Sequence, residues 1–216
     1  MVKLNKTALP TGIDIKRDYR SKKIYDLLIK DCYSKCYICE DDSLPLELEH
    51  IIAHGGDDEL KYDWNNILAA CQHCNNAKNN KKYVRILNCV IDDPEDFLSI
   101  SIVVGSIFKT HVEITVLRET DESFATKDLL ELVYNGENTP RRNVYCPKLR
   151  KKVLREHNKL TALLRDYENE SNPRTREEYR LSIIAQLDRS SVFAAVKRST
   201  IGKNLKYAKD FGECLL

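Results

Sequence analysis

Apolar positions recur at helical spacing in two well-separated stretches of the chain. In residues 21–32, Ile24, Leu27 and Leu28 lie three and four positions apart, which predicts a short amphipathic helix. A longer stripe in residues 148–168 predicts a second helix, and it consists of Leu149, Val153, Leu160, Leu164 and Tyr167. Weaker patterns predict further helices at residues 126–134, 176–187 and 191–198.

Three other stretches have the pattern of strands. Residues 100–104 form a short apolar run, and residues 111–116 alternate between apolar and polar side chains. Leu46 and Leu48 alternate with acidic residues, which predicts a strand that ends at His50. Together with the helices, these strands indicate an α+β fold.

The distribution of these elements and of reactive side chains divides the chain into three parts. Residues 1–32 start with a polar stretch and are expected to form an N-terminal arm and the short helix. Residues 33–90 hold nearly all the side chains able to do chemistry. A break at residues 92–94 precedes the last part, because Asp-Asp-Pro is typical of a turn. Residues 91–216 are predicted to form a mixed, mainly helical region that docks a partner or substrate.

Composition narrows the class of protein. The chain has 216 residues, of which 31% are charged, and its net charge of +2 does not by itself indicate a nucleic-acid partner. No apolar run approaches the ~18 residues of a membrane span, and the N-terminus lacks the apolar stretch of a secretory signal. We therefore expect a cytoplasmic protein, whose eight cysteines bind metal or do redox chemistry rather than form disulfides.

Four of the cysteines form two C-x-x-C pairs. Cys36 with Cys39, and Cys71 with Cys74, can together supply the four ligands of a structural zinc site. A thiol redox motif and buried apolar cysteines are the alternatives. The 31 residues between the pairs exceed the spacing of a compact zinc ribbon, so a folded unit must lie between them. The other cysteines are expected to be buried packing residues, namely Cys32, Cys89, Cys146 and Cys214.

The segment between the pairs carries groups suited to metal-assisted phosphodiester hydrolysis. A neutral imidazole such as that of His50 can accept a proton from water. A carboxylate such as that of Glu49, with an amide oxygen, can hold a hard divalent cation such as Mg²⁺. In an ideal strand Glu49 and His50 point to opposite faces, so one site can use both only where the strand ends or twists.

Residues 33–83 resemble the HNH endonuclease motif, which implies a ββα-metal fold. The resemblance consists of six elements in order, namely Cys36-x-x-Cys39, Glu49-His50-Ile51-Ile52, Gly55-Gly56, Asn66-Ile67-Leu68, Cys71-x-x-Cys74 and Asn75-x-x-Lys78. It implies that the four cysteines hold zinc, that His50 is the general base, and that Asn66 orients this histidine and braces the turn. It also implies that Glu49 binds the catalytic cation.

Asn75 departs from the usual HNH pattern, in which a histidine occupies this position. Some HNH nucleases carry asparagine there and use it as a metal ligand. A neutral amide oxygen is a competent ligand for hard cations and a poor one for softer transition metals. The asparagine therefore favours Mg²⁺ or Mn²⁺ as the catalytic ion, with a degenerate, inactive site as the alternative.

Two basic regions are candidates for contact with a phosphate backbone. The first follows the second cysteine pair, and its candidate contacts are Lys78, Lys81, Lys82 and Arg85, together with His54 before the Gly-Gly turn. The second, residues 141–155, holds seven basic residues and no acidic one, with Tyr145 among them. A solvated helix face would have the same composition.

Looser resemblances extend beyond the motif. Residues 60–66, 93–94, 129–135 and 192–198 are similar to the HNH subunits of Septu-type and retron-linked antiphage systems. In those systems the nuclease works with an ABC-like ATPase. The resemblance therefore implies an ATPase protein partner and a role in antiviral defence.

A metal-dependent HNH endonuclease is thus the first functional hypothesis. Its substrate is nucleic acid, with DNA favoured by the general behaviour of the family and with RNA or tRNA as alternatives. The competing hypothesis is a non-catalytic zinc module that binds nucleic acid or protein. It is motivated by Asn75 and by the near-neutral net charge of the chain.

Overall fold

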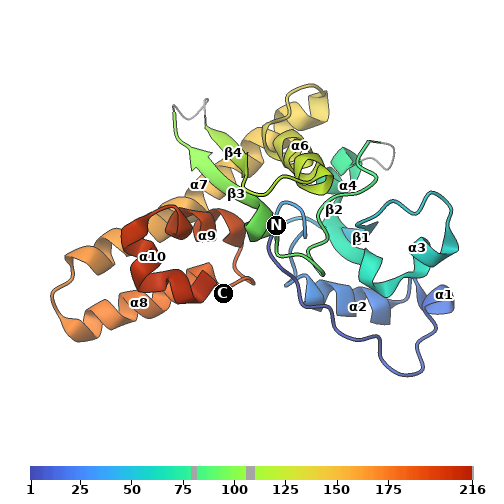
Figure 1. Cartoon of the computed structure of the whole chain (residues 1–216), viewed down its shortest axis with the longest axis horizontal. Helices are drawn as coiled ribbons and strands as arrows, with labels where there is room; N and C mark the ends of the chain where they lie inside the picture. Colours follow the sequence, from blue (N-terminus) through green and yellow to red (C-terminus); the bar gives the residue numbers. More distant parts are fainter. Residues whose placement is uncertain (79–81, 106–109, 216) are drawn as a thin grey trace.

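The computed structural model describes residues 1–78, 82–105 and 110–215. Helices predominate, and two separate two-stranded antiparallel sheets lie among them (Figure 1). The α+β fold predicted from the sequence is confirmed. In the described part of the chain, no helix combines the length and the apolar character needed to cross a bilayer.

The first sheet and its helices form a ββα unit in the N-terminal half. Its elements, in chain order, are β1 (Leu46–His50), α3 (Asp58–Tyr62), the 3-10 turn η1 (Trp64–Asn66), β2 (Ile67–Cys71) and α4 (Gln72–Lys78). The strands pair so that Leu46 lies opposite Cys71 and His50 lies opposite Ile67. α4 follows β2 directly and packs against both strands. Every residue of β2 is buried, which makes this strand the centre of the unit.

Two short helices precede the ββα unit, α1 (Ile15–Asp18) and α2 (Lys22–Asp31). The predicted helix at residues 21–32 is confirmed. It begins where the Ser21 hydroxyl accepts a hydrogen bond from the backbone N–H of Ile24, at 3.3 Å. α2 packs on β1 and β2, and its residues Ile24 and Leu28 are fully buried.

The second sheet follows the ββα unit. Its elements are α5 (Pro94–Phe97), β3 (Leu98–Val103), β4 (His111–Val116) and α6 (Asp121–Asn135). The strands predicted from the apolar run at residues 100–104 and from the alternation at residues 111–116 are confirmed as β3 and β4, which pair with each other over their full length. α6 begins before the predicted residue 126, because Thr120 and Ser123 form a reciprocal capping box at its start.

The C-terminal half is a group of helices built around the long α7. These elements are α7 (Pro140–Asn169), α8 (Pro173–Leu187), α9 (Ala194–Gly202), α10 (Leu205–Phe211) and the 3-10 turn η2 (Gly212–Leu215). α7 starts beside α6 and ends beside α8, so it connects the two halves of the molecule (Figure 1). It begins well before residue 148 because Thr139 caps it and Pro140 occupies its first turn, a start that the apolar stripe does not mark.

Buried polar contacts hold the first cysteine pair against the C-terminal helices. Glu40 follows Cys39, and its carboxylate accepts a hydrogen bond from the backbone N–H of Ala195 at 3.1 Å. The buried ammonium of Lys35 donates to the carbonyls of Arg189 and Ser191, at 2.6 and 2.7 Å. The loop that carries Cys36 and Cys39 is therefore held at both of its ends, by Lys35 before the first cysteine and by Glu40 after the second.

A buried lysine in α9 makes the stability of the C-terminal half depend on pH. Lys197 is 1% exposed, and burial lowers its pKa from 10.5 to about 8, against the opposing attraction of Glu156. Between about pH 8 and 10.5 this lysine is neutral in the folded protein and protonated in the unfolded chain, so unfolding takes up a proton. The free energy of unfolding therefore rises as the pH increases through this window, because the folded protein no longer buries a charge. We expect the free energy of unfolding of the wild type to rise by about 1–3 kcal/mol relative to that of Lys197→Met across this pH window. Urea unfolding of both proteins at several pH values measures this, and a constant difference would contradict it.

Candidate active site and cysteine cluster

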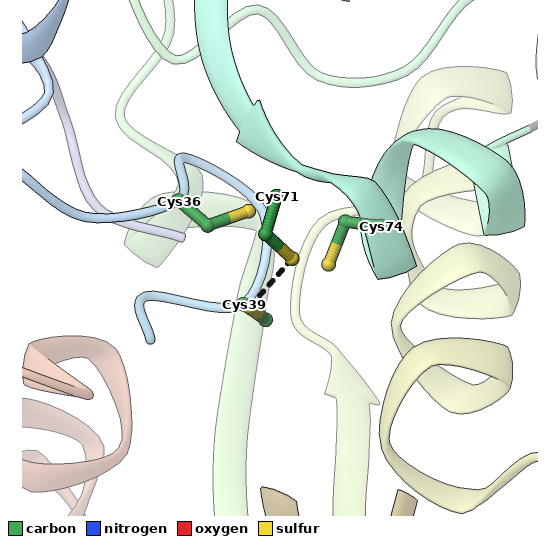
Figure 2. A group of neighbouring side chains, drawn as sticks. All are labelled: Cys36, Cys39, Cys71 and Cys74. Atoms are coloured by element: carbon green, nitrogen blue, oxygen red, sulfur yellow. Dashed lines mark hydrogen bonds between the residues drawn. The ribbon is translucent and has the colours of Figure 1, made fainter. Parts of the chain in front are cut away.

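The two cysteine pairs come together at one buried point. Cys36 and Cys39 lie in the loop after α2, Cys71 ends β2, and Cys74 is in α4 (Figure 2). All four thiols are buried, and their sulfur atoms lie within 4.8 Å of one another. The Sγ atoms of Cys39 and Cys71 are 3.9 Å apart. The sequence spacing thus predicts the cluster correctly.

The cluster fits a structural zinc ion. A tetrahedral site with Zn–S bonds of about 2.3 Å places neighbouring sulfurs about 3.8 Å apart, close to the separation of Cys39 and Cys71. Burial opposes ionisation of Cys36, but hydrogen bonds from the other three thiols hold its pKa well below the usual range. Hydrogen bonds with the neighbouring thiols and burial instead raise the pKa values of Cys39 and Cys74 well above the usual range, so a bound cation is needed to ionise all four thiols.

His50 ends β1 and is oriented by a backbone carbonyl. Its Nε2 lies 3.0 Å from the carbonyl oxygen of Lys61 and 3.2 Å from the hydroxyl of Tyr19. Because a carbonyl can only accept, Nε2 carries the proton and Nδ1 holds the lone pair. Among the described residues, no hydrogen bond engages Nδ1. Burial lowers the pKa of His50 below its ordinary value of 6.5, despite the opposing Lys61 carbonyl, which favours the neutral imidazole.

Asn66 fixes the loop that orients His50. Its amide oxygen accepts from the backbone N–H of Ile52 at 2.8 Å, and its amide nitrogen donates to the carbonyls of Ile52 and Leu60, at 3.0 and 2.9 Å. Leu60 precedes Lys61, whose carbonyl accepts from His50. Asn66 therefore acts on the histidine through the loop rather than by direct contact.

Truncation of Asn66 should loosen this loop. Asn66→Ala leaves three backbone groups without their partner, and we expect a loss of about 2–4 kcal/mol in the free energy of unfolding. The exposed neighbour Asn65 provides the control, because Asn65→Ala removes the same side chain type at a surface position. Denaturant unfolding of both variants measures the effect. Equal stability of the two would show that the three hydrogen bonds contribute little.

Glu49 is paired with a buried lysine. The ammonium of Lys78, which is 0% exposed, donates to the Glu49 carboxylate at 3.0 Å and to the carbonyl of His50 at 2.6 Å. Burial raises the pKa of Glu49, and Lys78 opposes this shift. The expected contact of Lys78 with phosphate is wrong for this structure, because its charge points into the ββα unit and closes α4 onto β1.

Asn75 lies one helical turn before Lys78 and faces the same strand. Its Nδ2 donates to the carboxylate of Glu47 at 3.2 Å, which leaves its Oδ1 as the free acceptor of the amide. α4 thus lies over the face of β1 that carries Glu47 and Glu49. β1 ends at His50, and the imidazole contacts Tyr19 and Lys61 next to the Glu49 carboxylate rather than α4.

The remaining candidates for phosphate contact are half-buried or exposed. The ring of His54 is 4.8 Å from that of His50, and its Nδ1 accepts from the backbone N–H of Gly56 at 3.1 Å. Lys82 and Arg85 are exposed. Lys81 lies outside the described residues.

Two groups at the site have no signature in the sequence. Tyr19 belongs to the polar N-terminal arm, yet its ring stacks on His50 at 5.9 Å between centroids. Lys61 contributes a backbone carbonyl, which any residue would provide. Only the fold brings these groups to the histidine, because nothing in their spacing along the chain relates them to it.

Comparison with known proteins gives one match. No curated protein and no solved structure matches the chain. Residues 34–81, the segment that holds the cysteine cluster and most of the ββα unit, match the family model of the HNH endonucleases.

Proposed function

We propose that this protein is a metal-dependent endonuclease that hydrolyses phosphodiester bonds in nucleic acid, with His50 as the general base. The observation that carries the proposal is the hydrogen bond between His50 Nε2 and the carbonyl of Lys61. It fixes the tautomer and leaves Nδ1 to accept a proton from a water molecule. The match of residues 34–81 to the HNH endonuclease family supports the same reaction.

Glu49 and Asn75 are the residues proposed to hold the catalytic cation. Their carboxylate and amide oxygens suit a hard ion such as Mg²⁺ or Mn²⁺. Glu47 supports this role, because it accepts from Asn75 Nδ2 and leaves Oδ1 for the ion. When bound, such a cation supplies charge stabilisation to the scissile phosphate and the leaving oxygen.

The biological setting is proposed from the resemblance of the sequence to nuclease subunits of antiphage systems. In this proposal the protein is an effector of antiviral defence, acts on DNA in preference to RNA or tRNA, and works with an ABC-like ATPase. The mainly helical part from residue 91 onward is the region proposed for docking that partner.

One contact favours a second candidate function, a non-catalytic zinc module that binds nucleic acid or protein. Lys78 already neutralises Glu49 at 3.0 Å and would compete with a divalent cation for its carboxylate. In such a module His50 would be a packing residue, and its replacement would leave ligand binding unchanged.

Cleavage assays separate these two functions. The purified full chain is incubated with plasmid DNA and with total RNA, with and without Mg²⁺ or Mn²⁺, beside the His50→Ala variant. We expect nicking that requires the added metal and disappears in the variant, and the substrate that is cut identifies its class. Folded, zinc-loaded protein that cuts neither substrate, alone or with its ATPase, would favour the binding module.

A further inference from the structure

The first half of α7 carries a basic surface beside the ββα unit. Arg141, Tyr145 and Lys148 are exposed and lie four and three residues apart, so they share one face of the helix. Lys151 and Arg155 continue the exposed positive charge along the helix. Within the described part of the chain, Lys148 and Lys151 make no ion pair. This surface therefore has cations available for a ligand.

Two hollows have Tyr145 in their lining. The first, of about 180 Å³, is bounded by Glu47, Gln72 and Arg141, and the second, of about 230 Å³, by Asp41, Lys148 and Lys152. Both hollows are lined by Leu44, His73 and Tyr145. Tyr145 thus borders two recesses at the junction of α7 and the ββα unit.

The ring of Tyr145 is held in place by a buried histidine. It stacks on His73 with 5.4 Å between ring centroids and 14° between ring planes. His73 is buried, and its Nε2 is 3.0 Å from the carbonyl of Val133, so Nε2 donates and the imidazole cannot rotate freely. Tyr145 itself is 37% exposed. An aromatic ring that is both fixed and open to solvent is suited to stacking with a base.

The acidic groups that border the hollows are already engaged. Both carboxylate oxygens of Asp41 accept from the ammonium of Lys152, at 3.0 and 2.8 Å. Glu47 accepts from Asn75, the residue proposed to bind the catalytic cation. Lys152 thus neutralises Asp41, whereas Glu47 keeps its negative charge beside Arg141. Within the described residues, Arg141 and Lys148 are the cations that line the hollows without an ion pair. The same contact of Glu47 joins the lining of the first hollow to Asn75, one of the residues proposed to bind the catalytic cation.

We propose that this surface binds an unpaired strand of the nucleic-acid substrate, with Tyr145 stacked on one base and Arg141 and Lys148 on the flanking phosphates. The inference rests on the proposed function in taking nucleic acid as the substrate. An unpaired strand is required because the exposed tyrosine ring can stack only on a base with a free face, and the bases of a duplex are already covered on both faces by their neighbours. Residues 141–155 extend for about 21 Å along α7, which provides a track for several nucleotides.

Fluorescence anisotropy tests this with a labelled DNA strand of about 12 nucleotides, its RNA counterpart and the matching duplex. The protein is the zinc-loaded full chain with His50→Ala and no added divalent metal, so that nothing is cut. We expect Tyr145→Ala to weaken binding of the single strand by about 5- to 150-fold, while Tyr145→Phe keeps it. The double variant Arg141→Gln with Lys148→Gln should lower the slope of log K against log salt by about 1.4.

A distant double variant controls for net charge. Arg174→Gln with Lys209→Gln removes two exposed cations from α8 and α10, far from the ββα unit (Figure 1). Equal weakening by both double variants, a preference for the duplex, or no binding of any probe would overturn the inference. Wild-type cleavage that is unaffected by Tyr145→Ala would overturn it while leaving the nuclease proposal intact. Binding lost in Tyr145→Ala, in a protein that never cleaves, would support this site and reject the nuclease.

Discussion

Replacing Cys74 by serine is expected to release zinc and to unfold the ββα unit. Zinc bound by four thiolates contributes roughly 10–16 kcal/mol of binding free energy, which is comparable to the entire stability of a typical domain, about 5–15 kcal/mol. The four ligands come from the loop after α2, from β2 and from α4. Loss of one ligand therefore weakens the connection among three separate elements, one of which is β2, the most buried strand.

The measurement combines metal content with secondary structure. We expect the wild type to carry one zinc per chain and the Cys74→Ser variant to carry none, with a loss of helical signal in circular dichroism. Cys89→Ser is the matched control, because Cys89 is equally buried but lies outside the cluster. This variant should keep its zinc, and its free energy of unfolding should fall only by the cost of burying a hydroxyl. A Cys74→Ser protein with full zinc content and a wild-type melting temperature would contradict a structural role for the metal.

Local patterns predict the parts of this fold that depend on neighbours in sequence. The cysteine cluster follows from two C-x-x-C spacings, and β1 follows from the alternation that ends at His50, whereas its pairing with β2 agrees with the ββα fold implied by the resemblance to the HNH motif. The early part of α7 is missed because its first turns are stabilised by Thr139 and by packing on α6 rather than by an apolar stripe. Hydrophobic periodicity reports only the buried face of a helix, so exposed basic turns give no signal.

Long-range polar contacts are the part that the sequence does not predict. Lys78 sits in a basic stretch and has the composition of a phosphate ligand, yet its ammonium is buried against Glu49 and the carbonyl of His50. The cost of burying a charge is offset only by partners that tertiary structure supplies. Tyr19 is similar, because its contact with His50 joins residues that are remote in sequence. Both cases concern the candidate site, where side chains from separate elements meet.

His50→Ala is expected to lower the rate of cleavage by about 10²–10⁴-fold, the usual contribution of a positioned general base. The fold should survive, because the strand pairing of His50 with Ile67 uses backbone groups and Asn66 continues to hold the loop. Single-turnover cleavage of a defined DNA or RNA strand measures the rate, and zinc content and thermal unfolding confirm that the variant is folded. The exposed His111 on β4 supplies a matched control, since His111→Ala removes the same group away from the site.

A second variant separates proton transfer from simple packing. Tyr19→Phe keeps the ring that stacks on His50 and removes only the hydroxyl at 3.2 Å from Nε2. Because the Lys61 carbonyl still fixes the tautomer, we expect the cleavage rate of this variant to fall by less than about tenfold, which corresponds to the loss of one modest hydrogen bond. Imidazole added to His50→Ala should restore part of the lost rate if the missing group is a base, whereas a packing defect gives no such rescue. Cleavage by His50→Ala at the wild-type rate would remove this residue from the mechanism and assign the proton transfer to another group.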